Sequence, residues 1–236
     1  MRKIGTVAGY ALALLFPLLM PASAQVFDFT TIDVPGASST LPRGINPEGD
    51  IVGFYGIGAA FRGFLIHQGV VTDIEVPGAS ATRPRSINPQ GDIAGFYVAG
   101  GVTHGFLYVD GTFNTIDVPG ASSTQIFGIN PRGEAVGQYA ASGVTHGFLL
   151  DNRGNFTTID VPGATSTQPL GINARGDVSG QYSAGGITHG FLLRDGTFAA
   201  IDFPGASSTA AQGINSEGSI VGTYSLGGVT HGFMAR

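Results

Sequence analysis

The sequence predicts an all-β fold, a five-bladed β-propeller, and three observations lead to that prediction. Each repeat contains four short stretches with the pattern of a β-strand, and no stretch has a helical period over ten residues. Four antiparallel strands in about 40 to 45 residues are typical of a propeller blade. An Ile-Asp-Val-Pro-Gly phrase or a close variant recurs every 42 or 43 residues, with its proline at Pro35, Pro77, Pro119, Pro162 and Pro204.

The segment 86–128 serves as one repeat from which the elements can be assigned. Turn residues separate the first two expected strands, and the two-residue turn Asp110-Gly111 joins the last two. Pro119 ends the fourth strand because proline cannot donate to a ladder. The four expected strands span residues 86–88, 92–97, 104–109 and 112–118.

The repeats are out of phase with the chain ends by one strand. The first expected strand, Phe29–Val34, has the pattern of the fourth strand of a repeat, but the first three strands of that repeat do not precede it. The last expected strand, His231–Phe233, has the pattern of a third strand. Pairing these two strands would close a ring, whereas an open array would leave two unpaired edges. We therefore expect a closed five-bladed propeller, with an open array of β-hairpin repeats as the alternative.

The hairpin register predicts a recurring pair of side chains. Across the turn at Asp110-Gly111, His104 lies opposite Asp117, and one repeat has Arg62 and Glu75 at these positions. Because both partners are exchanged together, we interpret the pair as a cross-strand fastener rather than as a catalytic His–Asp dyad with Ser38-Ser39-Thr40. The remaining predicted pairs are His146 with Asp160, His189 with Asp202, and His231 with Asp33.

Residues 1–24 have the features of a secretory signal peptide. Arg2 and Lys3 precede an apolar run over residues 10–20, and small residues lead to a cleavage site after Ala24. We expect residues 25–236 to form a single five-repeat domain, secreted or periplasmic. The apolar run over residues 10–20 is too short to span a membrane, and no other long apolar run follows it.

Composition limits the classes of partner. The chain from residue 25 onward has nine arginines, no lysine and 16 acidic residues, so a nucleic-acid partner is disfavoured. The histidines recur on different repeats beside carboxylates, so we predict no metal site and no other cofactor. The partner we expect is a polysaccharide or a cell-surface component.

Each repeat places a tyrosine at the end of its second strand. Strand alternation brings these tyrosines to the face that carries the histidines and the Ser/Thr loops. They are candidates for sugar contacts, and the alternative is packing between blades. The five are Tyr55, Tyr97, Tyr139, Tyr182 and Tyr224.

The triplets before each Ile-Asn phrase differ between repeats, although the framework around them is uniform. We expect them to line the rim of the channel, where Arg43, Arg83, Arg85 and Phe127 would form an anion-binding patch. Free variation of a surface loop is the alternative. The triplets are 41–43, 83–85, 125–127, 168–170 and 210–212.

Four phrases carry a resemblance to a known family: Gly-Ile-Asn-Pro-x-Gly, Val-Gly-x-Tyr, His-Gly-Phe-Leu and Phe-x-x-Ile-Asp. Over residues 29–236 they resemble the probable extracellular repeat of the HAF family. The family's His-Ala-Phe reads His-Gly-Phe in four copies here and Arg62-Gly63-Phe64 in the other. The resemblance implies bacterial export and a repeat architecture, with no established activity.

These observations predict a secreted, non-enzymatic binding or scaffold module that binds a glycan or an anion on one face of the ring. One alternative is a purely structural cell-surface or matrix protein. Another is a propeller glycoside hydrolase, which would need two non-equivalent carboxylates facing each other in the channel. The acidic residues repeat with the ring, and no unique pair stands out.

Overall fold

The structure is a computed structural model that describes residues 30–236, so the expected signal peptide and Phe29 lie outside it. Residues 32–236 form one compact unit of nineteen strands. The all-β prediction is confirmed. Over residues 30–236 there is no helix, and hence no helical segment with the length and apolarity to cross a bilayer.

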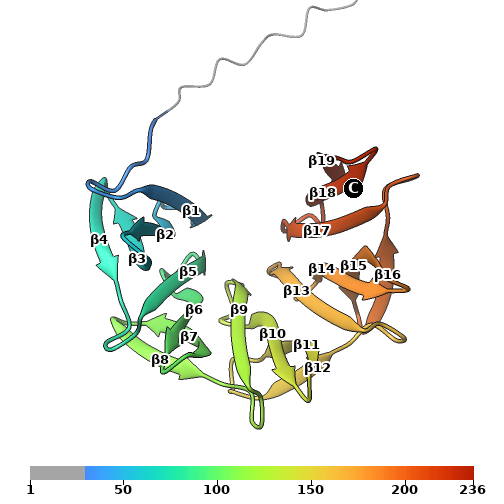
Figure 1. The fold of residues 1–236 in the computed structure, drawn as a ribbon, viewed down its shortest axis with the longest axis horizontal. Helices are drawn as coiled ribbons and strands as arrows, with labels where there is room; N and C mark the ends of the chain where they lie inside the picture. Colours follow the sequence, from blue (N-terminus) through green and yellow to red (C-terminus); the bar gives the residue numbers. More distant parts are fainter. Residues whose placement is uncertain (1–29) are drawn as a thin grey trace, which may run out of the picture. The chain divides into compact units, whose positions relative to one another are not determined.

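Each of the first four repeats contributes four antiparallel strands, and the fifth contributes three (Figure 1). Repeat one contains β1 (Ser39–Ile45), β2 (Ile51–Ile57), β3 (Ala60–His67) and β4 (Val70–Ile74). Repeat two contains β5 (Ala81–Ile87), β6 (Ile93–Ala99), β7 (Val102–Val109) and β8 (Thr112–Ile116). Repeat three contains β9 (Ser123–Ile129), β10 (Ala135–Ala141), β11 (Val144–Leu150) and β12 (Phe156–Ile159). Repeat four contains β13 (Ser166–Ile172), β14 (Val178–Ala184), β15 (Ile187–Arg194) and β16 (Thr197–Ile201), and repeat five contains β17 (Ser208–Ile214), β18 (Ile220–Leu226) and β19 (Val229–Ala235).

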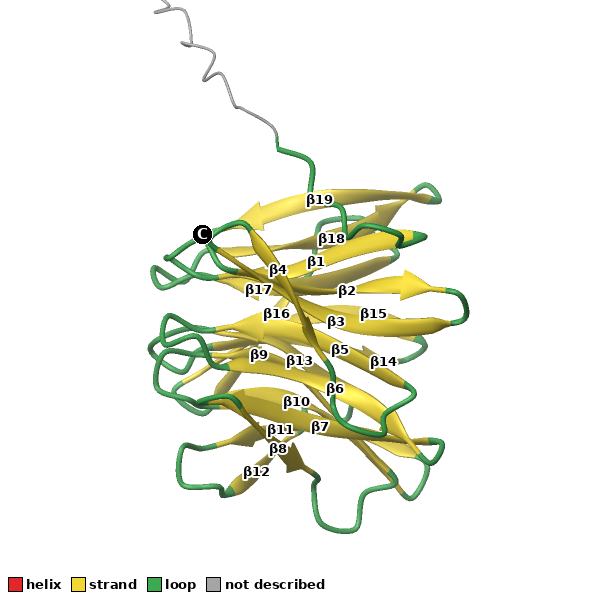
Figure 2. Cartoon of the chain, turned by 90° about the vertical axis from the view of Figure 1, so that its left-hand side faces the viewer, coloured by secondary structure: helices red, strands yellow, loops and turns green. Residues whose placement is uncertain are grey.

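Within residues 32–236 the repeats follow one another around a common centre. The first strand of each repeat lies nearest that centre, and the fourth strands β4, β8, β12 and β16 lie outermost (Figure 1). In the side view the turns gather at the two ends of the strands (Figure 2). The innermost strands are therefore the elements that can present side chains to a shared central space.

The two-residue turns have the backbone that the sequence demands. Asp110 and Gly111 both have positive φ, 48° and 77°, as a type I′ hairpin requires. The ladder after this turn pairs Phe106 with Thr115 and Tyr108 with Phe113, which is the predicted register. Local turn chemistry thus determines how the third and fourth strands align.

The core lies at the junctions between repeats. Phe64, Phe106, Phe148 and Phe191, one from each of the first four repeats, are fully buried. The glycine before each of them allows the fourth strand and the next repeat to come close. A Cβ on Gly147 would lie 2.5 Å from the Ile159 carbonyl oxygen and 2.6 Å from Pro169 Cδ.

Asparagines at the first turn of repeats two, three and four link each of these repeats to the next one. Asn130 accepts backbone hydrogen bonds within its own turn, and its Nδ2 donates to the carbonyl of Asn173 at 3.1 Å. Asn173 donates in the same way to Asn215 at 3.1 Å, and Asn88 donates to Asn130 at 3.4 Å. Each asparagine therefore satisfies its own turn and fastens the next repeat.

The predicted pairing of the chain ends is not formed in the structure. Residues 30–34 belong to no strand, β19 pairs only with β18, and the described residues contain no ion pair or hydrogen bond between Asp33 and His231. The inner hairpins are aligned by a tight turn, whereas about 200 residues separate these two ends. Bringing such ends together costs loop-closure entropy that no local turn offsets.

Both ends of the unit expose apolar side chains that the inner repeats bury. Ile45 of β1 is 68% exposed, whereas the equivalent Ile87 is 7% exposed. Val221 of β18 is 52% exposed, whereas the equivalent Val52 is fully buried. Within the described residues, each end thus presents one half of an inter-repeat interface.

Candidate functional site

The innermost strands surround a cavity of about 340 Å³ that receives a side chain from every repeat. Five of its lining residues occupy the same position in the five repeats. The sixth, Gln181, comes from β14. The five equivalent residues are Arg43, Arg85, Phe127, Leu170 and Gln212.

A β-bulge turns each of these five residues out of its ladder. In β5 the register shifts between Pro84 and Ser86, so Arg85 has no partner on β6. The other four innermost strands shift at the same place. A bulge leaves one residue unpaired and re-aims its side chain, and here it directs that side chain into the cavity. The triplets, which were expected to lead into the innermost strands at the rim of the channel, therefore lie inside those strands.

Three arginines concentrate positive charge beside the cavity. Over residues 30–236, Arg43, Arg83 and Arg85 form no ion pair, whereas Arg62, Arg132, Arg175 and Arg194 each contact a carboxylate. Burial, and then the like charges of Arg43 and Arg83, lower the pKa of the Arg85 guanidinium. The cluster therefore carries charge that no acidic side chain in the described residues neutralises.

Aromatic rings hold the three guanidiniums in place. Arg43 lies over Phe54 at 5.2 Å, Arg83 over Phe61 at 4.4 Å and Arg85 over Phe127 at 5.3 Å, each measured from Cζ to the ring centroid. Stacking orients a guanidinium but leaves its in-plane N–H groups free to donate.

One donor of this cluster is buried and unused. Arg83 Nε is buried and has no hydrogen-bond partner in the described residues. Buried donors without a partner are rare in proteins.

The rest of the cavity wall has an apolar part and a part formed by side-chain amides. Phe127 and Leu170 form the apolar part, and Gln181 and Gln212 form the amide part. Gln181 Nε2 donates to the side-chain oxygen of Gln168, which fixes its orientation. Cation, apolar surface and amide thus follow one another in the order of the repeats.

Four of the five predicted cross-strand pairs are formed. The Arg62–Glu75 distance is 3.1 Å, and the three His Nδ1–Asp distances are 2.7 to 3.0 Å. These side chains are partly exposed at the ends of the strands, away from the lining of the central cavity. The structure also contains a pair that the repeat pattern did not predict, His67 with Asp50 at 2.7 Å.

The tyrosines pack against neighbouring elements. Tyr55 and Tyr97 are buried, and their hydroxyls bond Asp73 at 2.9 Å and Thr115 at 2.8 Å. Burial, and then the Asp73 carboxylate, raise the pKa of Tyr55. Tyr139, Tyr182 and Tyr224 are partly exposed and stack on histidines, as Tyr139 does on His146 at 5.1 Å.

Two equivalent pockets lie beside the His–Asp pairs. One, of about 230 Å³, contains His146 and Asp160 with the Pro-Gly loop that leads to repeat four. The other, of about 260 Å³, contains His189 and Asp202 with the loop that leads to repeat five. These pockets recur with the repeat, unlike the central cavity, whose lining changes from repeat to repeat.

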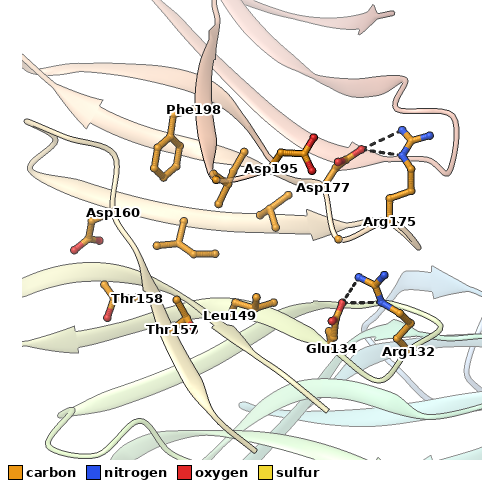
Figure 3. A pocket seen from close by; sticks show the side chains of 15 residues that line it. Arg132, Glu134, Leu149, Thr157, Thr158, Asp160, Arg175, Asp177, Asp195 and Phe198 are labelled. Carbon is orange, nitrogen blue, oxygen red and sulfur yellow. Dashed lines mark hydrogen bonds and ion pairs between the residues drawn. The ribbon is translucent and has the colours of Figure 1, made fainter. Parts of the chain in front are cut away.

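A further groove, of about 510 Å³, runs along β12 where this strand faces repeat four (Figure 3). Both arginines in its lining contact a carboxylate of the same groove. Arg132 contacts Glu134 at 2.6 Å, and Arg175 contacts Asp177 at 3.0 Å. The groove lining therefore has no unpaired arginine, unlike the central cavity, and its Asp195 forms no ion pair among the described residues.

Three residues of the central cavity were missed by the sequence-based candidate list, namely Leu170, Gln181 and Gln212. Leu170 and Gln212 could have been found, because they occupy the same repeat position as Arg43. Gln181 lies on the second strand, outside the variable triplets, and no sequence signal separates it from neighbouring polar residues.

Neither a protein-family model nor a curated protein matches the sequence. Solved structures resemble the fold. A TolB-like protein from Agrobacterium tumefaciens is 14% identical, with a TM-score of 0.64, over 84% of this chain and 76% of that one. A streptogramin B lyase is 15% identical, with a TM-score of 0.52, over 86% and 70%. A catalytically inactive virginiamycin B lyase from Staphylococcus aureus, solved with quinupristin, is 13% identical, with a TM-score of 0.51, over 82% and 70%. At such low identity these likenesses show the fold, a β-propeller, and nothing of the chemistry.

Proposed function

We propose that this chain is an exported binding module that holds a small organic anion in its central cavity. One observation carries the proposal. Five bulge residues, one from each repeat, converge on the cavity, and the two arginines among them, Arg43 and Arg85, have no carboxylate partner. The framework is kept uniform from repeat to repeat, whereas the five bulge residues differ from one another except for these two arginines.

Electrostatics favours an anion over a neutral ligand. Like charges held together in a partly buried site destabilise the empty protein, and a bound anion relieves that repulsion. Guanidinium groups bind carboxylates and phosphates through two parallel hydrogen bonds, which gives geometric specificity as well as energy. The aromatic rings under Arg43, Arg83 and Arg85 preorganise the donors for such a ligand.

The lining of the cavity argues against a glycoside hydrolase. Hydrolysis of this kind uses two carboxylates that flank the scissile bond. The residues that line the central cavity include no aspartate or glutamate. A binding function therefore agrees better with the chemistry of the site than the enzymatic alternative does.

The proposal includes closure of the five repeats into a ring. The exposed Val221 and Ile45 correspond to Val52 and Ile87, which pack together where repeat one meets repeat two. A small pocket lined by Ile32, Pro42 and Ile45 lies at the free face of repeat one. Closure would fill this pocket and surround the cavity with repeats on all sides.

Export is proposed on the basis of residues 1–24, which carry the signal-peptide pattern. The resemblance to the HAF extracellular repeat supports the same compartment.

Anion binding is tested by isothermal titration calorimetry with phosphate, acetate and glucuronate. We expect at least one carboxylate ligand to bind, and the double variant R43Q/R85Q to lose at least tenfold in affinity. The control R153Q/R236Q removes two exposed arginines outside the cavity, so it changes net charge equally. Absence of binding for every anion, or equal loss in the control, would overturn the proposal.

A second candidate function follows from the recurring pockets beside His146 and His189. Equivalent weak sites on one ring would bind a repetitive polysaccharide with avidity. The double variant H146A/H189A should then weaken retention on a polysaccharide column while anion binding in the central cavity stays unchanged. Unchanged retention would remove this candidate.

A further inference from the structure

We infer that the anion held in the central cavity is an acidic monosaccharide of the uronic-acid class. The inference rests on the proposed function and adds the identity of the ligand. The cavity offers three kinds of surface in sequence around the centre, and one ligand must match all three. They are a cationic part at Arg43 and Arg85, an apolar part at Phe127 and Leu170, and an amide part at Gln181 and Gln212.

The cationic part requires a carboxylate or a phosphate. Arg85 is buried enough that burial and neighbouring positive charge lower its pKa, so its charge is poorly solvated without a ligand. Arg43, which stacks on Phe54, supplies a second guanidinium to the same cavity. A ligand without negative charge would leave both guanidiniums uncompensated.

The apolar part excludes a bare inorganic anion as the ligand that fills the cavity. Phe127 is partly buried and packs edge-on against Phe96, with ring centroids 6.2 Å apart. Phosphate or sulfate would leave this ring and Leu170 facing water. The C–H surface of a pyranose ring covers such apolar side chains.

The amide part distinguishes a sugar acid from an apolar carboxylate. Gln181 is oriented by its hydrogen bond to Gln168, and Gln212 has no hydrogen-bond partner in residues 30–236. An apolar carboxylate would displace water from these amides without replacing the hydrogen bonds, which disfavours its binding. Ring hydroxyls both donate and accept, so they can satisfy a glutamine amide from either side.

The size of the cavity limits the ligand to about one sugar residue. Its volume of about 340 Å³ lies at the lower end of the usual range for ligand pockets, about 300 to 1,000 Å³. In the closed ring proposed above the five repeats would surround this space, so a long chain could enter only along the central axis. We therefore assign the site to a single uronate or to the terminal residue of an acidic glycan.

The experiment compares three ligands of similar size on the full-length mature protein by titration calorimetry. Glucuronate has the charge and the hydroxyls, cyclohexanecarboxylate has the charge alone, and glucose has the hydroxyls alone. We expect glucuronate to bind at least tenfold more tightly than cyclohexanecarboxylate, and glucose to bind least. Equal affinity for the two carboxylates would overturn this inference and leave anion binding intact, whereas no binding by either would overturn both.

Two variants assign the discrimination to the amides. Q212L and Q181L replace each glutamine by leucine, the residue type already present in the lining at Leu170. We expect each to reduce the glucuronate preference about three- to tenfold, because glucuronate loses a hydrogen-bond partner and cyclohexanecarboxylate no longer covers an unpaired amide. If the preference for glucuronate over cyclohexanecarboxylate is unchanged in both variants, the amides do not recognise the sugar hydroxyls. Circular dichroism spectra and thermal unfolding of each variant exclude a loss of fold as the cause.

Discussion

At the residue scale, seven arginines fall into two sets, four that form ion pairs with carboxylates and three that lie against aromatic rings without an ion pair in the described residues. Arg62, Arg132, Arg175 and Arg194 meet carboxylates near the ends of the strands. Arg43, Arg83 and Arg85 meet aromatic rings instead. The first set serves the fold, and the second set is the part of the molecule whose charge needs an external partner.

The set that forms ion pairs predicts a pH-dependent stability. Burial acts to raise the pKa of Asp177, but hydrogen bonds from Arg194, Asn173 and Arg175 outweigh it and hold the pKa below its usual range. A carboxyl group with a depressed pKa stabilises the fold above its unfolded pKa of about 3.9, and that contribution is lost as the pH falls through the folded value.

The variant D177N tests this contribution by urea unfolding at pH 7 and pH 3. We expect it to lower the free energy of unfolding by about 2 kcal/mol at pH 7, because charged hydrogen bonds are lost. The difference from the unchanged protein should shrink at pH 3. D92N changes the same turn position in repeat two, where no ion pair is found among the described residues, and should cost less. A difference that is equal at both pH values would contradict the assignment.

At the element scale, the hairpins follow from sequence and the bulges do not. The two-residue turns Asp110-Gly111 and Gln68-Gly69 determine the register of the third and fourth strands, so the partners of His104 and Arg62 could be worked out by counting. The first strands were predicted too short, over residues 86–88 rather than 81–87, because Arg83, Pro84 and Arg85 do not look like a strand. A bulge has no strong signature in one sequence, so the triplets were placed before the strand rather than inside it.

The glycine before each buried phenylalanine gives a prediction about how repeats pack. G147A should lower the free energy of unfolding by about 1 to 3 kcal/mol, because the added methyl group meets the Ile159 carbonyl and Pro169 at overlapping distance. The chain contains no tryptophan, so chemical unfolding followed by far-ultraviolet circular dichroism measures the change in the free energy of unfolding. Full stability in G147A would show that neighbouring repeats are not held this closely.

At the scale of the whole molecule, the same substitution reports on ring closure. A Cβ on Gly232 would have no neighbour closer than 3.8 Å in the structure, because no fourth strand covers β19. In a closed ring, Gly232 would take the environment of Gly147. We therefore expect G232A to destabilise the protein about as much as G147A does, and an unaffected G232A would favour the open array.

A disulfide gives a second, independent test of closure. In D33C/H231C, the two cysteines replace the pair predicted to join the chain ends, and we expect an intramolecular cross-link under oxidising conditions. Mass spectrometry of the monomer with and without reductant measures it. The control D33C/H189C places the second cysteine on an inner repeat and should stay reduced in the monomer. A folded D33C/H231C protein without the cross-link would contradict closure.

The period and the composition of the repeat were sufficient to predict the all-β class, the four-stranded pattern and the direction of the variable residues toward the centre. The chain ends were beyond such reasoning because their pairing depends on long-range association rather than on a local turn. Phe127 was among the sequence-based candidates, but Leu170, Gln181 and Gln212 were missed, because such single residues acquire meaning only when the repeats are brought together.

The bulge position has a practical consequence for engineering. It lets five side chains around one cavity vary while the backbone that carries them repeats unchanged. A combinatorial library at residues 43, 85, 127, 170 and 212 would sample new selectivities from a single scaffold. Each member would keep the hairpins, the asparagine links and the buried phenylalanines that make the scaffold fold.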